Sequence, residues 1–384
     1  MIYITKYKNK KDKKYKYEYR IKYKDPITQK YREKSKKGFD SKPEALHAAT
    51  LVEKKILEGL EQTPISLEEF FKTWLEEYKK DIVRKNTYNQ HVYSIEKHIL
   101  PYFKNILLQD LKPIMYQKFL NYLADDKGYS KRTIEIVHTT FYNACDRAVL
   151  LGKLEKNPCK NAIIKGKVKN KEIEYMESDN IQKFLTVAYA DNYNYWLFFK
   201  VLIETGMRKG EAAAIQWTDV DLKNKTIDIN KTLDFQTKED EELFGETKNY
   251  SSERVITISQ SLANDLHFHM KVQNQNKLVL NEMYHHDLNL VFCRNDGNYL
   301  PKSTLFNAMK RITKKAGIPD ISIHALRHTH AVLLLESGAS MKYVQERLGH
   351  GSMQITADVY SHISKKIEAD TMDKFEDYTK DILN

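Results

Sequence analysis

Apolar and polar residues alternate over residues 15–23, where four tyrosines and Ile21 take every second position and charged residues take the others. A period of two predicts a strand with one aromatic face and one charged face. Residues 30–36 predict a second, weaker strand after a turn at Asp25-Pro26, and Ser41 is expected to cap a helix. Residues 1–60 therefore predict a β-hairpin or three-stranded sheet packed on one helix.

From residue 65 onward the hydrophobic period becomes helical. Ser66 is expected to cap a first helix, with Glu69 completing a capping box. Further helices are expected at 87–98, 114–124 and 130–151. Leu100-Pro101 is expected to stop the helix at 87–98, and Gly152 is expected to close the helix at 130–151. Residues 65–165 therefore predict a compact helical domain.

Two polar segments, 61–64 and the basic stretch 165–171, are interpreted as linkers. From Glu177 to the end the pattern is that of helices with one strand-rich insert, whose strand signals lie at 225–232, 250–258 and 290–293. The predicted fold class is a multidomain, mainly α protein. It combines a small β-sheet and helix (1–60), a helical domain (65–165) and a mixed α+β domain (173–384).

The net charge of +11 is concentrated at the start of the chain. Residues 1–40 hold 13 lysines and 2 arginines against 5 acidic residues, a net charge of +10. Such a basic segment indicates a polyanionic partner. Membrane surfaces are also polyanionic, so charge alone does not select DNA. A β-ribbon can lie in a DNA groove, however, and this favours DNA contact by the charged strand face over a merely solvated one.

The three cysteines, at 145, 159 and 293, show no metal-binding or disulfide spacing, which is typical of a reducing cytosol. No apolar run approaches the ~20 residues that span a bilayer, and no signal-peptide stretch follows Met1. We therefore expect a bacterial cytoplasmic protein, associated with the nucleoid and not with a membrane.

Chemistry-bearing residues concentrate in three later segments. Arg208 lies between Gly206 and Gly210 at an expected helix end and restart, where a guanidinium and backbone N–H groups can face an anion. His324-Ala325-Leu326-Arg327 and Leu348-Gly349-His350 add further donors, and Tyr360 follows ten residues later. Arginine matches two phosphate oxygens at once, histidine moves protons near neutral pH, and tyrosine can form a covalent intermediate.

Each of these residues also has a plainer interpretation. Arg208 alone would be a charged surface turn, and a lone tyrosine is usually a residue at the edge of a core. His324, His328 and His330 have spacings that permit zinc, but no glutamate follows the first histidine and no cysteine lies nearby. We therefore predict no metal and no cofactor.

The set resembles the tyrosine recombinase (phage integrase) family, on Thr205-Gly206-Met207-Arg208-Lys209-Gly210-Glu211, the His-x-x-Arg motif at 324–327, Leu348-Gly349-His350 and Tyr360. The resemblance covers the whole chain. It implies an arm-site DNA-binding domain at 1–60, a core-binding domain at 65–165 and a catalytic domain at 173–384 with a C-terminal subunit-docking segment. The first of these domains favours integration and excision of a mobile element, a phage or transposon.

The resemblance also implies the roles of the site residues. Arg208 and Arg327 would clamp the scissile phosphate, and Tyr360 would attack it to leave a 3′-phosphotyrosyl link. His324 would assist proton transfer and His350 would donate to a phosphate oxygen. Glu211 would orient its neighbours. Lys248 best fits the lysine that protonates the leaving oxygen; the long acidic insert 235–246 leaves Lys238 as the alternative.

The implied partners are double-stranded DNA with core and arm sites, a homotetramer on that DNA, an excisionase and a host DNA-bending protein. The expected DNA-contacting residues are Lys16, Arg20, Lys22, Lys85 and Arg132. Two other functions stay open. A non-catalytic DNA-binding regulator would have no use for Tyr360 and both arginines, and a type IB topoisomerase would share the chemistry without needing an arm-binding domain.

Overall fold

The computed structural model describes residues 2–9, 14–24, 30–57, 64–168, 173–235, 243–246, 253–349 and 351–353, together with 357, 372, 375–376 and 379–380. The chain divides into two compact units, residues 1–170 and 171–384. The predicted turn at Asp25-Pro26 and most of the predicted linker at 61–64 lie outside the described residues.

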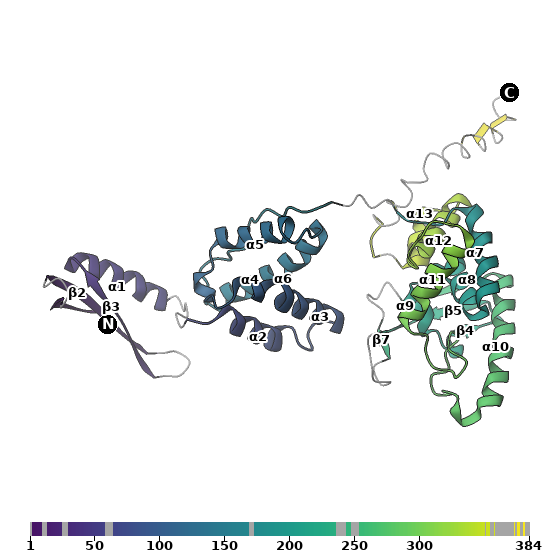
Figure 1. Ribbon diagram of the computed structural model, residues 1–384, viewed down its shortest axis with the longest axis horizontal. Coiled ribbons are helices and arrows are strands. Elements are labelled where there is room, and N and C mark those ends of the chain that lie inside the picture. The colour runs from purple at the N-terminus through teal and green to yellow at the C-terminus, as the bar shows by residue number, and fades with distance from the viewer. Residues whose placement is uncertain are drawn as a thin grey trace. The chain divides into compact units, whose positions relative to one another are not determined.

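The first unit begins with an antiparallel sheet and a helix (Figure 1). Its elements follow in the order β1 (Ile2–Lys8), β2 (Tyr15–Lys24), β3 (Tyr31–Phe39) and α1 (Lys42–Leu57). The helix begins where expected, because the Ser41 hydroxyl accepts a bond from the Glu44 N–H at 3.3 Å. Tyr19, Ile21 and Phe39 are buried with two alanines of α1. The predicted sheet packed on one helix, with an aromatic inner face, is confirmed.

The rest of the first unit is helical, as predicted. Ser66 and Ser130 each cap a helix by accepting a backbone bond three residues ahead, at 3.1 and 3.2 Å. Aromatic side chains fill the core, with Phe141 in contact with Phe71, Phe103 and Tyr116. The helices are α2 (Leu67–Tyr78), α3 (Lys85–Ser94), η1 (Ile95–Ile99), α4 (Leu100–Phe103), η2 (Leu108–Asp110), α5 (Pro113–Asp125) and α6 (Lys131–Leu150).

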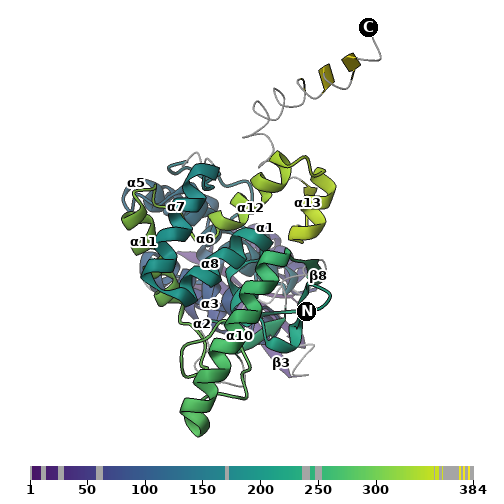
Figure 2. The ribbon, with the colours of Figure 1, turned by 90° about the vertical axis from the view of Figure 1, so that its right-hand side faces the viewer.

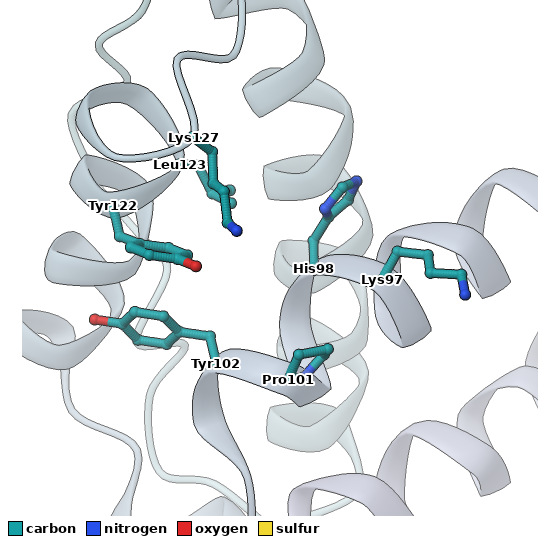
Figure 3. A pocket seen from close by; sticks show the side chains of 7 residues that line it. All are labelled: Lys97, His98, Pro101, Tyr102, Tyr122, Leu123 and Lys127. Atoms are coloured by element: carbon teal, nitrogen blue, oxygen red, sulfur yellow. The ribbon is translucent and has the colours of Figure 1, made fainter.

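The expectation that Pro101 stops the second helix is wrong. The helix widens into the π-turn η1 and continues through Pro101 to Phe103. Proline is tolerated there because the π-turn η1 interrupts the regular i→i−4 ladder directly before Pro101, so its missing N–H costs less than in a regular helix. The widened turn borders a hollow of about 90 Å³ (Figure 3), which is lined by Lys97, His98, Pro101, Tyr102, Tyr122, Leu123 and Lys127.

The basic segment 165–171 is only partly the linker that the sequence predicts. Lys167 forms a β-bridge with Ser130, and a Cβ on Gly166 would lie 2.7 Å from the Lys131 nitrogen. The segment therefore packs on the start of α6 as far as its described residues reach, and 169–171 lie outside them.

The second unit combines a bundle of helices with short strands (Figure 2). Strands β4, β5 and β8 form one antiparallel sheet in that order, and β6 pairs with β7. The strands are β4 (Val220–Asp221), β5 (Thr226–Ile229), β6 (Lys231–Leu233), β7 (Phe244–Glu246) and β8 (Arg254–Thr257). The helices are α7 (Ser178–Asp191), α8 (Tyr193–Thr205), α9 (Lys209–Ala214), η3 (Trp217–Asp219), α10 (Gln260–Leu280), η6 (Asn281–Met283), α11 (Lys302–Ala316), α12 (Ala325–Glu336) and α13 (Met341–Leu348).

The predicted strands at 225–232 and 250–258 are confirmed by β5, β6 and β8, whereas the one at 290–293 is wrong. Leu290 and Cys293 form only isolated bridges, to Gln216 and Tyr299. The run is apolar because it is buried in the main core of the unit, not because it joins a ladder. The predicted multidomain, mainly α fold, with a mixed α+β unit at its end, is nonetheless confirmed. Within the described part of the chain, no helix is both long and apolar enough to cross a membrane.

Candidate active site

The first arginine lies at a helix end and restart, as predicted. Gly206 closes α8 in the left-handed conformation, with φ of 67°, and α9 begins after Arg208. Glu211, in the first turn of α9, accepts the Arg208 N–H at 2.9 Å and its Nη1 at 2.6 Å. The acidic residue therefore fixes both the backbone and the guanidinium of Arg208.

The second arginine comes from α12, which packs against α8 and α13 (Figure 2). Arg327 is only 2% exposed, whereas His324 is exposed at the N-cap of the same helix. Arg327 donates through Nη1 to the Gly206 carbonyl at 2.8 Å, so the two motifs that lie over a hundred residues apart in the sequence meet in the structure.

The end of α13 is the point at which these groups converge. Gly349 closes this helix in the left-handed conformation, as predicted. Three successive carbonyls accept bonds from three arginines: Arg347 O from Arg254 at 2.7 Å, Leu348 O from Arg327 at 2.6 Å and Gly349 O from Arg208 at 3.2 Å. The last carbonyls of a helix lack partners within it and carry partial negative charge, so guanidinium groups satisfy them well.

The electrostatics keep Arg327 charged in spite of its burial. Burial is the main cause that lowers the pKa of Arg327 to about 9, and the positive charge of Arg208 is the second cause. At this pKa the side chain is still a cation at neutral pH. Burial would raise the pKa of Glu211, but the charge and hydrogen bonds of Arg254 and the bond from Arg208 hold it below its ordinary value. Among the described residues of the site, one carboxylate contacts two guanidiniums and a third lies close by, which leaves this part of the site positive and suited to an anion.

His330, one of the histidines considered for zinc, is a structural residue. Its Nδ1 bonds to the Ile203 carbonyl at 2.8 Å, and its Nε2 accepts the Arg347 Nε–H at 3.0 Å. Burial and the charge of Arg347 lower its pKa to about 4, so the ring is neutral. Both ring nitrogens are thus engaged by protein groups. The described residues contain no group of three potential metal ligands from His, Cys, Asp and Glu.

Four of the expected site residues lie outside the described part of the chain: Lys248, its alternative Lys238, His350 and Tyr360. Their roles stay predictions. The structure does bring together Arg208, Arg327 and Glu211, and it ends α13 one residue before Gly349, which His350 follows in the chain.

The sequence did not point to two arginines that the structure places in this site, Arg254 and Arg347. A signal for Arg254 was available, because period two places it on the same strand face as the buried Ile256. A charge on an inward-facing strand position indicates a buried partner. No comparable signal marks Arg347 in the sequence. This residue lies within α13, where polar residues occupy most positions, so a further charge does not stand out.

Three sequence profiles match the chain. The phage integrase family matches residues 174–366, the phage integrase N-terminal SAM-like domain residues 66–124, and the arm DNA-binding domain residues 5–56. The first match alone covers half of the chain.

The chain belongs to the phage integrase family.

As a member of this family of tyrosine recombinases, the chain is a site-specific DNA recombinase. A tyrosine recombinase XerC-like protein of Caldanaerobacter subterraneus subsp. tengcongensis is 30% identical over 334 residues, which cover 82% of this chain and 83% of the relative. The ICEBs1 integrase of Bacillus subtilis is 27% identical over 296 residues, covering 77% of this chain and 78% of the relative.

Solved structures of the family share the fold. The Tn1549 transposon integrase, in complex with transposon right end DNA, superposes with a TM-score of 0.66 at 17% identity, covering 81% of this chain and 99% of that one. A lambda integrase dimer bound to a COC′ core site superposes with a TM-score of 0.57 at 17% identity, and the match covers 92% of this chain and 93% of that one. At this level of identity the likeness concerns the fold alone.

The expected DNA-contacting residues of this recombinase lie on two parts of the first unit. Lys16, Arg20 and Lys22 share the face of β2 that points away from α1, where they pair with Asp40, Glu18 and Glu33. Lys85 begins α3, and Arg132, near the start of α6, pairs with Glu135 at 3.4 Å. Their DNA contacts stay predictions.

The charged face of β2 holds one feature that alternation did not predict. Glu18 is only 4% exposed, and it pairs with Arg20 at 2.9 Å and Lys37 at 3.1 Å. Burial would raise the pKa of Glu18, but the bonds from Lys37 and Arg20 lower it below its ordinary value. The carboxylate is therefore ionised and fixes two cations on this face.

Proposed function

We propose that this recombinase cleaves and rejoins DNA through a 3′-phosphotyrosyl intermediate, and that it integrates and excises a mobile element. The observation that carries the proposal is the convergence of Arg208 and Arg327 on adjacent carbonyls at the end of α13. Two guanidiniums fixed side by side match the two non-bridging oxygens of one phosphodiester.

In the first step the Tyr360 oxygen attacks the scissile phosphorus, and the bond from phosphorus to the 5′ oxygen breaks. Lys248 gives a proton to that leaving oxygen, while His324 assists proton transfer from the tyrosine. In the second step the 5′-hydroxyl of the partner strand attacks the phosphotyrosine and releases Tyr360. The number of phosphodiester bonds is conserved, so the cycle consumes no nucleotide.

The arginines lower the barrier to the attack by electrostatic stabilisation. A free tyrosine has a pKa near ~10 and is a weak nucleophile at neutral pH. Arg208, Arg327 and His350 stabilise both the phenolate and the charge that develops on the phosphorane. Because guanidiniums take this role, cleavage should persist in excess EDTA.

The arrangement of the whole chain supports the role in integration. We propose that residues 1–60 bind arm sites, that 65–165 and 173–384 enclose core sites, and that a homotetramer bridges both kinds of DNA, with an excisionase and a host DNA-bending protein as accessory partners. The matches to an arm DNA-binding domain and to integrases of mobile elements support this assignment.

A nicked suicide substrate tests the chemistry, because loss of the short fragment beyond the nick traps any covalent adduct. The natural substrate is the DNA that flanks the gene, since integrase genes often adjoin their attachment site. Wild-type protein should become linked to this DNA, whereas Tyr360→Phe should bind it without a link. Equal trapping of the Phe variant would assign the nucleophile elsewhere. Binding without any adduct would favour the DNA-binding regulator, and supercoil relaxation without strand exchange would favour a topoisomerase.

The choice between Lys248 and Lys238 needs a second substrate. Sulfur at the 5′ bridging position leaves without a proton, so it bypasses a missing general acid. Lys248→Ala should therefore cleave ordinary DNA slowly and the sulfur substrate at the wild-type rate. Rescue of Lys238→Ala in its place would reassign the role to that lysine.

A further inference from the structure

A third arginine shares the end of α13 with Arg208 and Arg327. Arg254 begins β8, and its side chain is 8% exposed. Its Nε donates to the Arg347 carbonyl at 2.7 Å, one residue before the carbonyl that accepts from Arg327. The two other arginines of this row have roles in phosphate binding under the proposed function, whereas Arg254 has none.

Arg254 is also joined to Arg208 through a carboxylate. Its Nη2 donates to Oε2 of Glu211 at 3.0 Å, and the same oxygen accepts the Arg208 N–H. Glu211 is 3% exposed, so water does not compete for this carboxylate. Without Arg254 the whole charge of Glu211 would fall on Arg208, which would draw that guanidinium away from a phosphate.

The contact between β8 and α13 is reciprocal. The side chain of Arg254 reaches the backbone of Arg347, and Nη2 of Arg347 donates to the Thr257 carbonyl at the end of β8, at 3.0 Å. Arg347 is held in turn by His330. Two bonds in opposite directions between the same two elements fix the position of the α13 end relative to β8, so each carbonyl there meets its own arginine.

We propose that Arg254 is a positioning residue for strand cleavage: it holds the end of α13 and, through Glu211, sets the guanidinium of Arg208, without touching DNA itself. The inference rests on the proposed function and adds a residue to it. Arg254 donates through Nη2 to Glu211 and through Nε to the Arg347 carbonyl, so both bonds hold neighbouring groups of the protein. It therefore acts on the reaction through geometry.

The first test compares Arg254→Lys with wild type on the suicide substrate under single-turnover conditions. Lysine keeps the charge but cannot reach both Glu211 and the Arg347 carbonyl with a planar fork. The affinity for core DNA should stay within about threefold, while the rate of adduct formation should fall about tenfold to a hundredfold. Arg311→Lys is the matched control. Arg311 pairs with Asp191, which lies just before the start of α8, at the helix end opposite Gly206.

Two further measurements separate positioning from a general structural effect. In a double-mutant cycle, the loss in Arg254→Lys combined with Glu211→Gln should be smaller than the product of the two single losses, because part of the effect of Arg254 passes through Glu211. A 5′-phosphorothiolate substrate should not rescue Arg254→Lys, since the leaving oxygen is not its target. Additive losses, or rescue by sulfur, would overturn the inference, as would a wild-type rate in Arg254→Lys.

A second variant tests the inference if circular dichroism shows that Arg254→Lys is unfolded at the assay temperature. Arg347→Lys breaks the other half of the cross-link and leaves Arg254 paired with Glu211. It should also slow adduct formation at unchanged DNA affinity, and an unchanged rate would overturn the inference. Failure of wild-type protein to form any adduct would instead refute the proposed function.

Discussion

Arg327 is a permanent charge placed in the interior of the protein. Two carbonyl oxygens, from Gly206 and Leu348, offset the loss of water around it. Arg208 lies close enough to lower its pKa, and among the described residues the charge of Glu211 acts against this repulsion. A phosphate would relieve this repulsion, so under the proposed function the site should favour a dianionic transition state over a neutral ligand.

Arg208→Lys should separate catalysis from binding. Arg208 is 32% exposed on its side chain, so the fold should tolerate a lysine, but the bidentate match to phosphate is lost. The rate of covalent adduct formation should fall about 10² to 10³-fold, by analogy with the loss of one oxyanion donor. Single-turnover trapping measures this rate. Arg294→Lys, which alters an exposed arginine near Asp296, should keep the wild-type rate.

A slowed Arg294→Lys variant would mean that any loss of arginine harms the reaction, and the Arg208 result would then say nothing of phosphate binding. Weakened core-DNA binding by Arg208→Lys, with a normal rate at saturation, would place Arg208 in ground-state binding instead.

His330 predicts an acid-sensitive stability. Its pKa is about 4 in the folded chain against an ordinary value of 6.5, so between these pH values only the unfolded chain takes up the proton. The free energy of unfolding should therefore fall as pH falls through this window, by roughly 1.4 kcal/mol per pH unit for this group. Urea unfolding at pH 7, 6 and 5 measures the trend.

His330→Gln is the matched variant for this trend. Glutamine can donate to the Ile203 carbonyl and accept from Arg347 without titrating. Its stability should fall less steeply with acid than that of the wild type. Parallel curves for the two proteins would show that other groups cause the acid sensitivity.

At the scale of elements, the end of α8 is a tightly packed junction of the second unit. Gly206 has φ of 67°, and a Cβ there would lie against Leu348 Cδ2 and 2.5 Å from His330 Cδ2. The close approach lets the Gly206 carbonyl reach Arg327 while α13 packs behind it. The glycine thus serves both the backbone turn and the contact between α8, α12 and α13.

Gly206→Ala and Gly317→Ala form a matched pair. Both glycines end a helix at nearly the same φ, but a Cβ on Gly317 would meet nothing within 4 Å. Gly317→Ala should cost about 1 kcal/mol of stability from backbone strain alone. Gly206→Ala should cost a further 1–3 kcal/mol or so from overpacking, and it should slow cleavage by displacing α13. Thermal unfolding and adduct trapping measure the two effects, and equal losses in both variants would contradict the packing argument.

At the scale of the whole molecule, charge and chemistry are segregated along the chain. Residues 1–40 carry +10 of the net charge, whereas the described site residues lie beyond residue 200. A charged segment that is separate from the clamp should have its own DNA site and its own salt dependence.

Deletion of residues 1–60 should separate two kinds of DNA binding. The truncated protein should still bind and cleave core DNA, but it should lose the arm footprints and fail in a two-plasmid integration assay. For the full chain, the logarithm of the affinity for arm DNA should fall steeply as the logarithm of the salt concentration rises. The slope should be about −0.9 for each phosphate contacted. Wild-type integration by the truncated protein, with every footprint kept, would show that residues 1–60 do not bind arm sites.

The sequence by itself determined most of the elements and the family. The alternation over residues 15–23, the caps Ser41, Ser66 and Ser130 and the glycine end of α13 are local signals, and local signals survive without any knowledge of the fold. The order of the motifs from Arg208 to Tyr360 identified the family because few other proteins need those residue types in that order.

The tertiary structure alone decided which side chains share the site. Arg254 and Arg347 lie 93 residues apart, and Arg327 and Gly206 lie 121 apart, so no sequence period links them. The pairing of the buried Glu18 depends likewise on a neighbour from another element, Lys37 of β3. Contacts of this kind arise only when packing brings distant segments together, because a buried polar group is stable only beside the partner that satisfies it.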